Sequence, residues 1–306
     1  MLAVLLAYLA AFGVASMAVA MASDMLQDYL GQGFTGGVLL GILTSLPETV
    51  FVSLATLRGD FQVALGSALG GNLILLTLGA SLVVIVYFAR WRRPITMRED
   101  YRTELSFMGI SSAILLGVVV ARVLNVWFSI AFASVYALYL WERARKVKTT
   151  GKPIPPSVLI KAGLIMGVAA LVLVFISGGF VQQIEESSLS LGVPPLVLAM
   201  LVSPLAAELE ENLSALIMAS KFERGGSIAL VSFMGSKIEN MTILLAIVGL
   251  AGIGVGGYWL YLTTVLLANL IFTVILLDGK ISLREAVELM LVYVILVSLS
   301  LIVKTR

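Results

Sequence analysis

The chain has 306 residues, of which 60% are hydrophobic and 12% are charged, and its mean hydropathy is +1.06. A soluble domain of this length could not cover its surface with so few polar side chains, so the composition indicates an integral membrane protein. The net charge of +2 argues against a nucleic-acid partner. Cysteine and histidine are both absent. A bound metal would therefore be a hard ion held by oxygen, and Ser-His or Cys-His catalysis is excluded.

Long apolar runs predict ten membrane-spanning helices, because about twenty residues of helix cross roughly 30 Å of hydrocarbon. We expect the first run to be a true span rather than a removable signal peptide, since it has no basic start and no cleavage site. The five aspartates fall at predicted helix ends or in loops, which argues against a membrane enzyme of the paired-aspartate type. The predicted spans are residues 1–21, 34–57, 62–89, 105–122, 125–141, 157–181, 190–219, 226–251, 256–277 and 283–303.

A polar linker at residues 142–156 divides the chain into two halves of five predicted spans, residues 1–141 and 157–306. Most lysines and arginines fall on one side of this layout, and the positive-inside rule makes that side cytoplasmic. Both termini are then extracytoplasmic. The protein itself is expected in the cytoplasmic (plasma) membrane. Because each half has an odd number of spans, the second half runs inverted relative to the first. We therefore predict an all-α polytopic membrane protein of two inverted five-helix repeats.

The first half carries a glutamate inside its second predicted span. A carboxylate at that depth costs roughly 2.5 to 3.5 kcal/mol, so Glu48 is expected to face a protein interior or a wet cavity. Pro47 would free backbone carbonyls one turn earlier, and Thr44 and Ser45 lie four and three residues before Glu48, on its helical face. Hydroxyl, carbonyl and carboxylate oxygens suit a hard cation. A simple proline kink would account for the hydroxyls but not for the glutamate.

The third predicted span opens with a run of small residues, 66–72. Such a run allows two helices to approach closely, and helix packing explains it as well as ion binding does. Asn72, at the end of the run, is a candidate site residue. These features define the site segment of the first half, residues 41–80.

The site segment of the second half, residues 201–250, contains three carboxylates in one predicted span. Left unpaired in hydrocarbon they would together cost about 8 to 10 kcal/mol, so protons, cations or a base must neutralise them. Glu208, Glu211 and Asn212 share a helical face, whereas Glu210 points away from them and could serve structure or a proton path.

The next predicted span places Ser236, Glu239 and Asn240 on one stripe, with Lys237 beside Asn240. Two interpretations of Lys237 are open. It forms a buried ion pair with one of the carboxylates, or it acts as a built-in cation in a subsite that a sodium ion would otherwise fill.

These residues resemble the two alpha repeats of the cation/calcium exchanger superfamily. The string from Thr44 to Glu48, followed by the run ending at Asn72, is similar to the sodium/calcium exchanger pattern. The second half departs from it. The stretch Glu211-Asn-Leu-Ser-Ala is more similar to Glu-His-Val-Ser-Ala of proton/calcium exchangers, and Gly235-Ser236 and Asn240 match the exchanger pattern again. In the first half, Gly71 and Leu75 stand at the positions of Ser236 and Asn240.

The resemblance implies an antiporter that exchanges Ca²⁺ for Na⁺ by alternating access, or Ca²⁺ or another divalent ion for H⁺, and neither an enzyme nor a cofactor-dependent protein. A cation channel, or a carrier of an organic cation, is the alternative of another class. It is disfavoured because the tryptophans lie near predicted interfaces rather than in the pocket. The expected partners are the lipid bilayer and the transported ions, with no protein partner implied. The residues expected to line the cation site are Glu48, Glu211, Thr44, Ser45, Glu208, Asn212, Ser236, Glu239, Asn240 and Asn72.

Overall fold

A computed structural model describes residues 2–30, 45–146 and 153–302 of the chain. Within these ranges the protein is helical apart from two pairs of two-residue strands. Seven helical segments of the described chain are long and apolar enough to cross a membrane, and they coincide with seven of the ten predicted spans. The other three predicted spans contain shorter or more polar helices, so the ten-span count stays a prediction.

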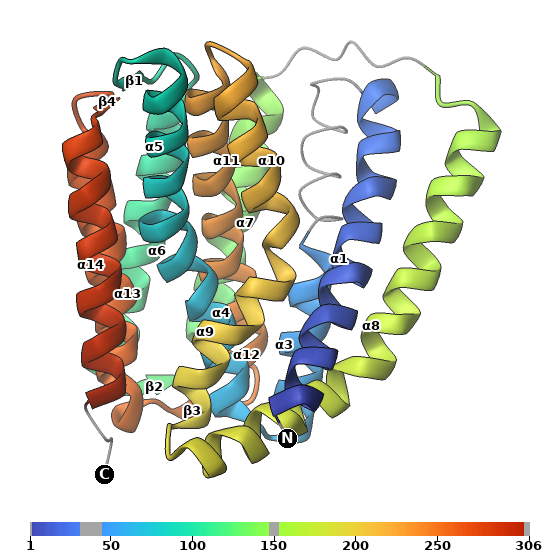
Figure 1. Ribbon diagram of the computed structural model, residues 1–306. Helices are drawn as coiled ribbons and strands as arrows, with labels where there is room; N and C mark the ends of the chain where they lie inside the picture. The colour runs from blue at the N-terminus through green and yellow to red at the C-terminus, as the bar shows by residue number, and fades with distance from the viewer. Residues whose placement is uncertain (1, 31–44, 147–152, 303–306) are drawn as a thin grey trace.

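The elements follow in chain order, and all of them are drawn in Figure 1. The first half contains α1 (Leu2–Leu30), α3 (Leu46–Arg58), α4 (Phe61–Leu73), η1 (Ile74–Gly79), α5 (Ala80–Trp91), β1 (Ile95–Thr96), α6 (Tyr101–Ala121), β2 (Val123–Leu124) and α7 (Val126–Lys146). The second half contains α8 (Pro156–Leu191), α9 (Pro195–Ala207), α10 (Leu209–Lys221), α11 (Gly225–Glu239), η2 (Asn240–Leu244), α12 (Leu245–Gly249), β3 (Ile253–Gly254), η3 (Gly256–Tyr258), α13 (Trp259–Leu276), β4 (Lys280–Ile281) and α14 (Leu283–Ile302).

Three helix boundaries differ from the sequence-based expectation. Helix α1 continues to Leu30, so Asp24 lies within a helix and not beyond its end. Pro47 lies in the first turn of α3, where proline is tolerated because its missing N–H has no helical acceptor, and not in the interior of a described helix. The predicted span 190–219 is two helices, since α8 runs on to Leu191 and the chain breaks between α9 and α10 at Glu208.

The break at Glu208 has a local cause. Pro204 cannot donate a backbone hydrogen bond to the preceding turn, which weakens the helix at this point. The chain leaves helical geometry four residues later, at Glu208, whose φ and ψ are −107° and 9°. Its side chain therefore projects from an interruption between two helices and not from a regular helical face.

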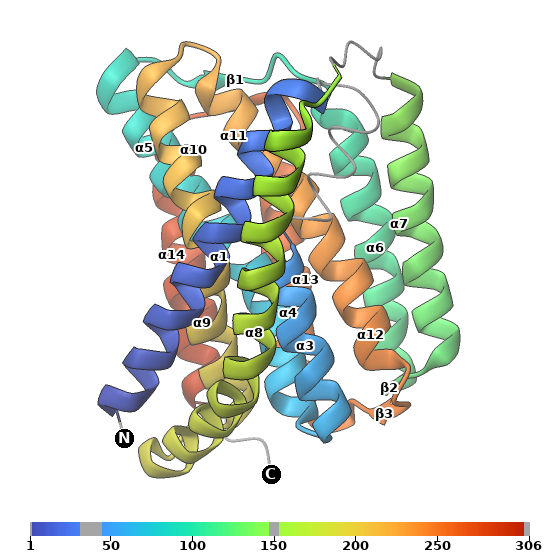
Figure 2. The same cartoon turned by 90° about the vertical axis from the view of Figure 1, so that its right-hand side faces the viewer.

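The helices form one elongated bundle in which α1 and α8 lie side by side and run in opposite directions (Figures 1 and 2). Helices α4 and α9 pack against each other deeper in the bundle. The N-terminal end of α1 and the C-terminal end of α14 lie at the same end of the bundle (Figure 1).

Each strand pair joins the two halves of the chain. Strand β1 pairs antiparallel with β4, and β2 pairs antiparallel with β3. The two pairs lie at opposite ends of the bundle, as Figure 1 shows. Each half therefore contributes one strand to each end.

Two large apolar clusters form most of the core, and three helical segments of the chain run from one cluster into the other. Residues 63–73 of α4 belong to the first cluster and residues 75–84 to the second. Across the broken helix the chain again passes from the first cluster, at residues 196–206, to the second, at residues 215–219. In the next helical segment it passes from the second cluster, at residues 229–238, to the first, at residues 241–248. The acidic and amide side chains of the second half's site segment lie at these crossover points.

Candidate functional site

The two halves of the chain meet in a buried group of carboxyl and amide side chains. Glu48, in the first turn of α3, is 5% exposed, and Glu208, at the helix break, is 3% exposed. Their carboxyl groups are within hydrogen-bonding reach of each other. The Asn240 amide donates to Oε1 of Glu208 at 2.9 Å and approaches Oε1 of Glu48 at 3.5 Å. Oxygen atoms from both halves thus converge on one place.

A base lies within this acidic group. Lys237 of α11 is 1% exposed, and its Nζ forms an ion pair with Oε1 of Glu208. The ammonium group also interacts electrostatically with Glu48 and Glu211. An ammonium buried without a partner would be very unfavourable, so the contact with Glu208 explains how this lysine can sit in the interior.

Glu211 lies one turn beyond the helix break and is hydrogen-bonded to Ser236 of α11. Its neighbour Glu210 points elsewhere, as the sequence predicts, and accepts a hydrogen bond from Ser214 at 2.8 Å. Asn212 donates from its amide to the backbone carbonyl of Glu208 at 3.0 Å. It therefore braces the broken helix, and its oxygen and its second N–H are left for other partners.

A second pair of contacts lies beside the central group. Ser45, immediately before α3, donates a hydrogen bond to the carboxylate of Glu239, which is 7% exposed. The hydroxyl of Tyr136 in α7 is also hydrogen-bonded to Glu239. Sequence reasoning did not select Tyr136, because a tyrosine in an apolar span has no pattern that separates it from an interfacial anchor. Thr44 lies outside the described residues.

The small-residue run at the start of the third predicted span serves two purposes. A Cβ at Gly66 would collide with the backbone of Leu196, and a Cβ at Gly70 with the backbone of Met200, so these glycines permit close packing of α4 on α9. A Cβ at Gly71 would instead collide with the side chains of Glu208, Asn240 and Lys237. The third glycine therefore leaves room for the site.

Asn72 is fully buried, and neither polar atom of its amide has a hydrogen-bond partner among the described residues. Oε2 of Glu208 and Oδ1 of Asn240 are likewise buried and without a partner in the described chain. Buried polar atoms in native proteins are usually hydrogen-bonded. Buried oxygens without a partner, next to carboxylates, are suited to bind a hard cation. No group of three or more acidic side chains of the described residues is close enough to hold a metal unaided.

Both halves contain a π-helical segment next to the site. Segment η1 follows α4 and η2 begins at Asn240. In each segment a buried threonine donates its hydroxyl to the carbonyl four residues earlier: Thr77 to Leu73, and Thr242 to Ile238. Single π-turns inside α-helices occur frequently at functional sites, and here they re-aim the side chains at the crossover between the two apolar clusters.

A further buried ion pair joins α6 to α7 and was not anticipated from the sequence. Glu104 is fully buried, forms an ion pair with Arg143 and accepts a hydrogen bond from Tyr139 at 3.3 Å. A Cβ at Gly235 would approach the same tyrosine hydroxyl at 3.1 Å. The spacing of Glu104 and Arg143 in the sequence carries no signal, because they lie on different helices.

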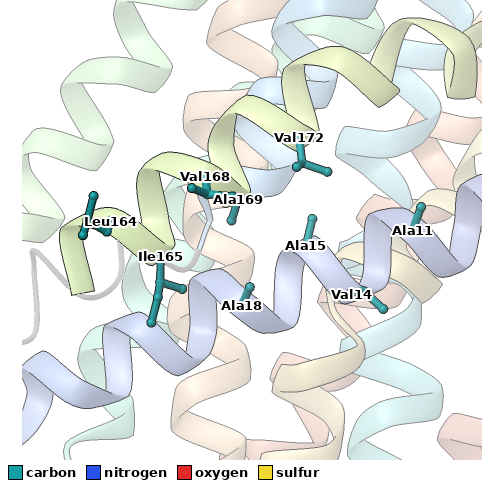
Figure 3. Close-up of a pocket in the computed structure, with 9 residues that line it drawn as sticks. All are labelled: Ala11, Val14, Ala15, Ala18, Leu164, Ile165, Val168, Ala169 and Val172. Atoms are coloured by element: carbon teal, nitrogen blue, oxygen red, sulfur yellow. The ribbon is translucent and has the colours of Figure 1, made fainter. Parts of the chain in front are cut away.

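A cavity of about 410 Å³ lies between α1 and α8, away from these polar residues. Figure 3 shows its lining, which consists of alanine, valine, leucine and isoleucine side chains from the two helices. With no oxygen or charge among its lining side chains, this cavity is unsuited to a cation. The polar group around Glu48 and Glu208 is therefore the candidate site.

The fold matches several solved structures at low sequence identity, among them two that are described as ion exchangers. An H⁺/Ca²⁺ exchanger, CAX, aligns with a TM-score of 0.83 and 17% identity over 96% of this chain and 84% of its own. Native YfkE aligns with a TM-score of 0.76 and 18% identity over 98% of this chain and 92% of its own. The sodium-calcium exchanger NCX_Mj aligns with a TM-score of 0.67 and 17% identity over 97% of this chain and 99% of its own. A search of curated proteins found no match.

The model of one protein family, described as sodium/calcium exchanger protein, matches residues 1–143 and 161–302. These ranges include both site segments and nearly all of the described helices. The chain therefore belongs to the sodium/calcium exchanger protein family, whose members are membrane cation/calcium exchangers, and it is a multi-pass membrane protein.

Proposed function

We propose that the protein is a secondary antiporter that exchanges Ca²⁺ for Na⁺ by alternating access, with Glu48 and Glu211 as the central ligands. The observation that carries this proposal is the meeting of Glu48 from the first half with Glu208 and Asn240 from the second in one buried group, with Glu211, which is partly exposed, close enough to interact electrostatically with Glu48. Carboxylate, amide and hydroxyl oxygens are the ligands that Ca²⁺ prefers. Ca²⁺ and Na⁺ are substrates here, and no further cofactor is proposed.

The exchange mechanism follows from competition for the same oxygens. A divalent ion and the coupling ions cannot all occupy these carboxylates, and an empty group of carboxylates is too highly charged to cross a low-dielectric barrier. Only a loaded site can then pass between the two open states, which couples the two fluxes. The remaining proposed ligands are Thr44, Ser45, Asn72, Glu208, Asn212, Ser236, Glu239 and Asn240.

Sodium is proposed as the coupling ion because the string from Thr44 to Glu48 resembles the sodium/calcium exchanger pattern. Protons are the second candidate, since the stretch beginning at Glu211 resembles that of proton/calcium exchangers. The solved relatives include exchangers of both kinds.

We also propose ten spans arranged as two inverted repeats, with residues 142–156 as the linker. Three pairs of features support the repeat: antiparallel α1 and α8, the segments η1 and η2 at matching places, and one strand from each half at each end of the bundle. By the positive-inside rule, the end that holds β1 and β4 is cytoplasmic and both termini are extracytoplasmic, in the plasma membrane.

The test uses purified protein in sealed liposomes loaded with radioactive Ca²⁺. We expect Ca²⁺ to leave the vesicles when an inward Na⁺ gradient is imposed, and the rate to be reduced at least about 30-fold in Glu48→Gln. Loss of one charged ligand costs ~2 kcal/mol, which corresponds to that factor. Glu288→Gln is the matched control, because Glu288 forms an exposed ion pair with Arg284 within α14.

The same vesicles separate the alternatives. Flux driven by a pH gradient and not by Na⁺ would replace sodium by protons as the coupling ion. Ca²⁺ flux that runs down its own gradient with no dependence on either ion would indicate a channel. Flux that is unchanged in Glu48→Gln would remove the proposed site.

A further inference from the structure

We propose that the ammonium group of Lys237 permanently occupies the place of one monovalent coupling cation, so that the protein exchanges one such ion fewer per Ca²⁺ than its carboxylates would otherwise require. This inference rests on the proposed function. It concerns the number of coupling ions, which neither the family nor the solved relatives fix for this chain.

The first step is the position of the ammonium. Its Nζ contacts Oε1 of Glu208, the same oxygen that accepts the Asn240 amide at 2.9 Å. The charged groups that face it are Glu208 at the helix break, Glu48 of α3 and Glu211 of α10, and Glu239 of α11 also interacts with it electrostatically. The positive charge of Lys237 therefore lies among the proposed ligands and not at their edge.

The second step is the space made for it. Gly71 of α4 lies against Lys237, Glu208 and Asn240, and any side chain there would collide with all three. The long side chain of Lys237 is 1% exposed, so its ammonium has no route by which to reach bulk water in this arrangement. The site thus has space for the lysine next to Gly71, and the lysine side chain is held there by burial.

The third step is a comparison between the halves. Taking Gly71 and Leu75 as the counterparts of Ser236 and Asn240 makes Asn72 the counterpart of Lys237. Asn72 is neutral, fully buried and without a hydrogen-bond partner among the described residues. The same place in the fold thus holds a neutral amide in one half and a fixed positive charge in the other.

A purely structural ion pair is the alternative. Buried ion pairs are weak evidence for stability, because apolar side chains of similar volume often serve the fold as well. A structural pair would affect folding and turnover rate but would leave the number of ions exchanged unchanged. The coupling ratio therefore distinguishes the two roles.

The experiment measures the equilibrium Ca²⁺ gradient that a known monovalent-ion gradient sustains in liposomes, with the membrane voltage held at zero. The gradient is that of the ion which drives the unmodified protein. One additional coupled ion moving down a tenfold gradient raises the final Ca²⁺ ratio roughly tenfold. This is an equilibrium quantity, so a slower transporter gives the same value as a fast one.

Three variants form a closed set. Lys237→Gln removes the fixed charge and should raise the coupling ratio by one ion. Glu208→Gln leaves the lysine without its counterion and should lower the ratio by one. The double variant Glu208→Gln/Lys237→Gln removes both charges and should return the ratio to that of the unmodified protein.

The possible outcomes each decide the question. An unchanged ratio in the single variants would overturn the inference while the proposed exchange stands. If both single variants are inactive in transport, the number of monovalent ions that displace one bound Ca²⁺ is measured at equilibrium in detergent: one more ion in Lys237→Gln than in the unmodified protein supports the inference, and an equal number overturns it. Failure of the unmodified protein to move Ca²⁺ under either gradient would instead remove the proposed function, and the inference with it.

Discussion

The two halves of the chain contribute unequally to the candidate site. The first half supplies one buried carboxylate, Glu48, together with Gly71 and the apolar Leu75. The second half supplies Glu208, Glu211 and Glu239, the counter-charge of Lys237 and the hydrogen-bond partner of Glu211, whereas Glu239 is bonded by Ser45 and Tyr136 of the first half. One half mainly provides room, and the other mainly provides charge.

If the two halves are the inverted repeats that we propose, this difference means that similar backbones carry an asymmetric chemistry. Both halves place a π-helical segment and a back-bonding threonine at matching positions, so local geometry has been kept. The side chains that this geometry presents are different. Substitutions that exchange space for charge should therefore have different effects in the two halves.

The largest effect is expected at adjacent carboxylates of the second half. Glu211→Gln should slow gradient-driven Ca²⁺ flux at least about 30-fold, because it removes a charged side chain that faces Ser236 and Lys237 and that we propose as a ligand. Glu210→Gln is the matched control, since Glu210 is bonded to Ser214 and faces away. Flux should stay within about twofold in the control, as is usual where no specific interaction with the substrate is lost. Equal losses in both variants would show that total charge, and not position, governs the site.

The next effect tests the space that the first half provides. Gly71→Ala should reduce Ca²⁺ flux at least about fivefold, because the new methyl group would displace Glu208, Asn240 and Lys237 at a cost of roughly 1 to 3 kcal/mol. Gly167→Ala in α8 is the control, as nothing lies within 4 Å of a Cβ there. Normal flux in Gly71→Ala would mean that the site does not need this room.

A smaller effect on transport, but a measurable one on stability, is expected one residue earlier. Gly70→Ala would press against the backbone of Met200 and should lower the stability of the purified protein by about 1 to 3 kcal/mol. Thermal unfolding in detergent measures this. A lower melting temperature in Gly70→Ala, with flux per folded molecule retained, would separate packing from ion binding within a single glycine run. Loss of flux without loss of stability would show instead that Gly70 serves the site and not helix packing.

Much of the site could be anticipated because its chemistry is conspicuous in a membrane sequence. A glutamate such as Glu48 or Glu211 stands out in an apolar span, since burial of its charge needs an explanation. The predictions that Glu210 faces away from Glu208 and Glu211 and that Lys237 lies among the carboxylates agree with the structure. The assignment of these residues as ion ligands stays a prediction.

The rest depended on features with no local signal. The break at Glu208 was missed because a helical wheel assumes a continuous helix, whereas Pro204 weakens the ladder four residues before the chain leaves helical geometry. Tyr136 contacts Glu239, and Glu104 pairs with Arg143, between helices that are far apart in the sequence. Such contacts leave no local sequence pattern. The sequence also could not tell which glycines of residues 66–72 serve helix packing and which leaves space for the site, because glycine carries no side chain that would indicate its neighbour.

The smallest effect concerns a contact between the halves outside the membrane-spanning segments. Glu223, between α10 and α11, pairs with Arg93 at 2.6 Å and with Arg98 at 3.3 Å, and both arginines belong to the first half. The hydrogen bond from Arg93 lowers the pKa of Glu223 below its usual value of 4.5. A lowered pKa means that the contact stabilises the folded protein at neutral pH and that this contribution is lost as the pH falls through the folded-state pKa. The pair is exposed, so its effect is small.

Glu223→Gln should accordingly lower the melting temperature slightly at neutral pH. The difference from the unmodified protein should shrink as the medium is acidified below pH 4.5, the usual pKa of the carboxyl. Glu288→Gln is the matched control, because its ion pair lies within α14 and joins no other element. If Glu223→Gln and Glu288→Gln have equal effects at neutral pH, the loop contact contributes no more than an ordinary surface pair. If instead Glu223→Gln has the higher melting temperature at neutral pH, the charge of Glu223 opposes the association of the two halves, and the comparison between them must include repulsion at this end.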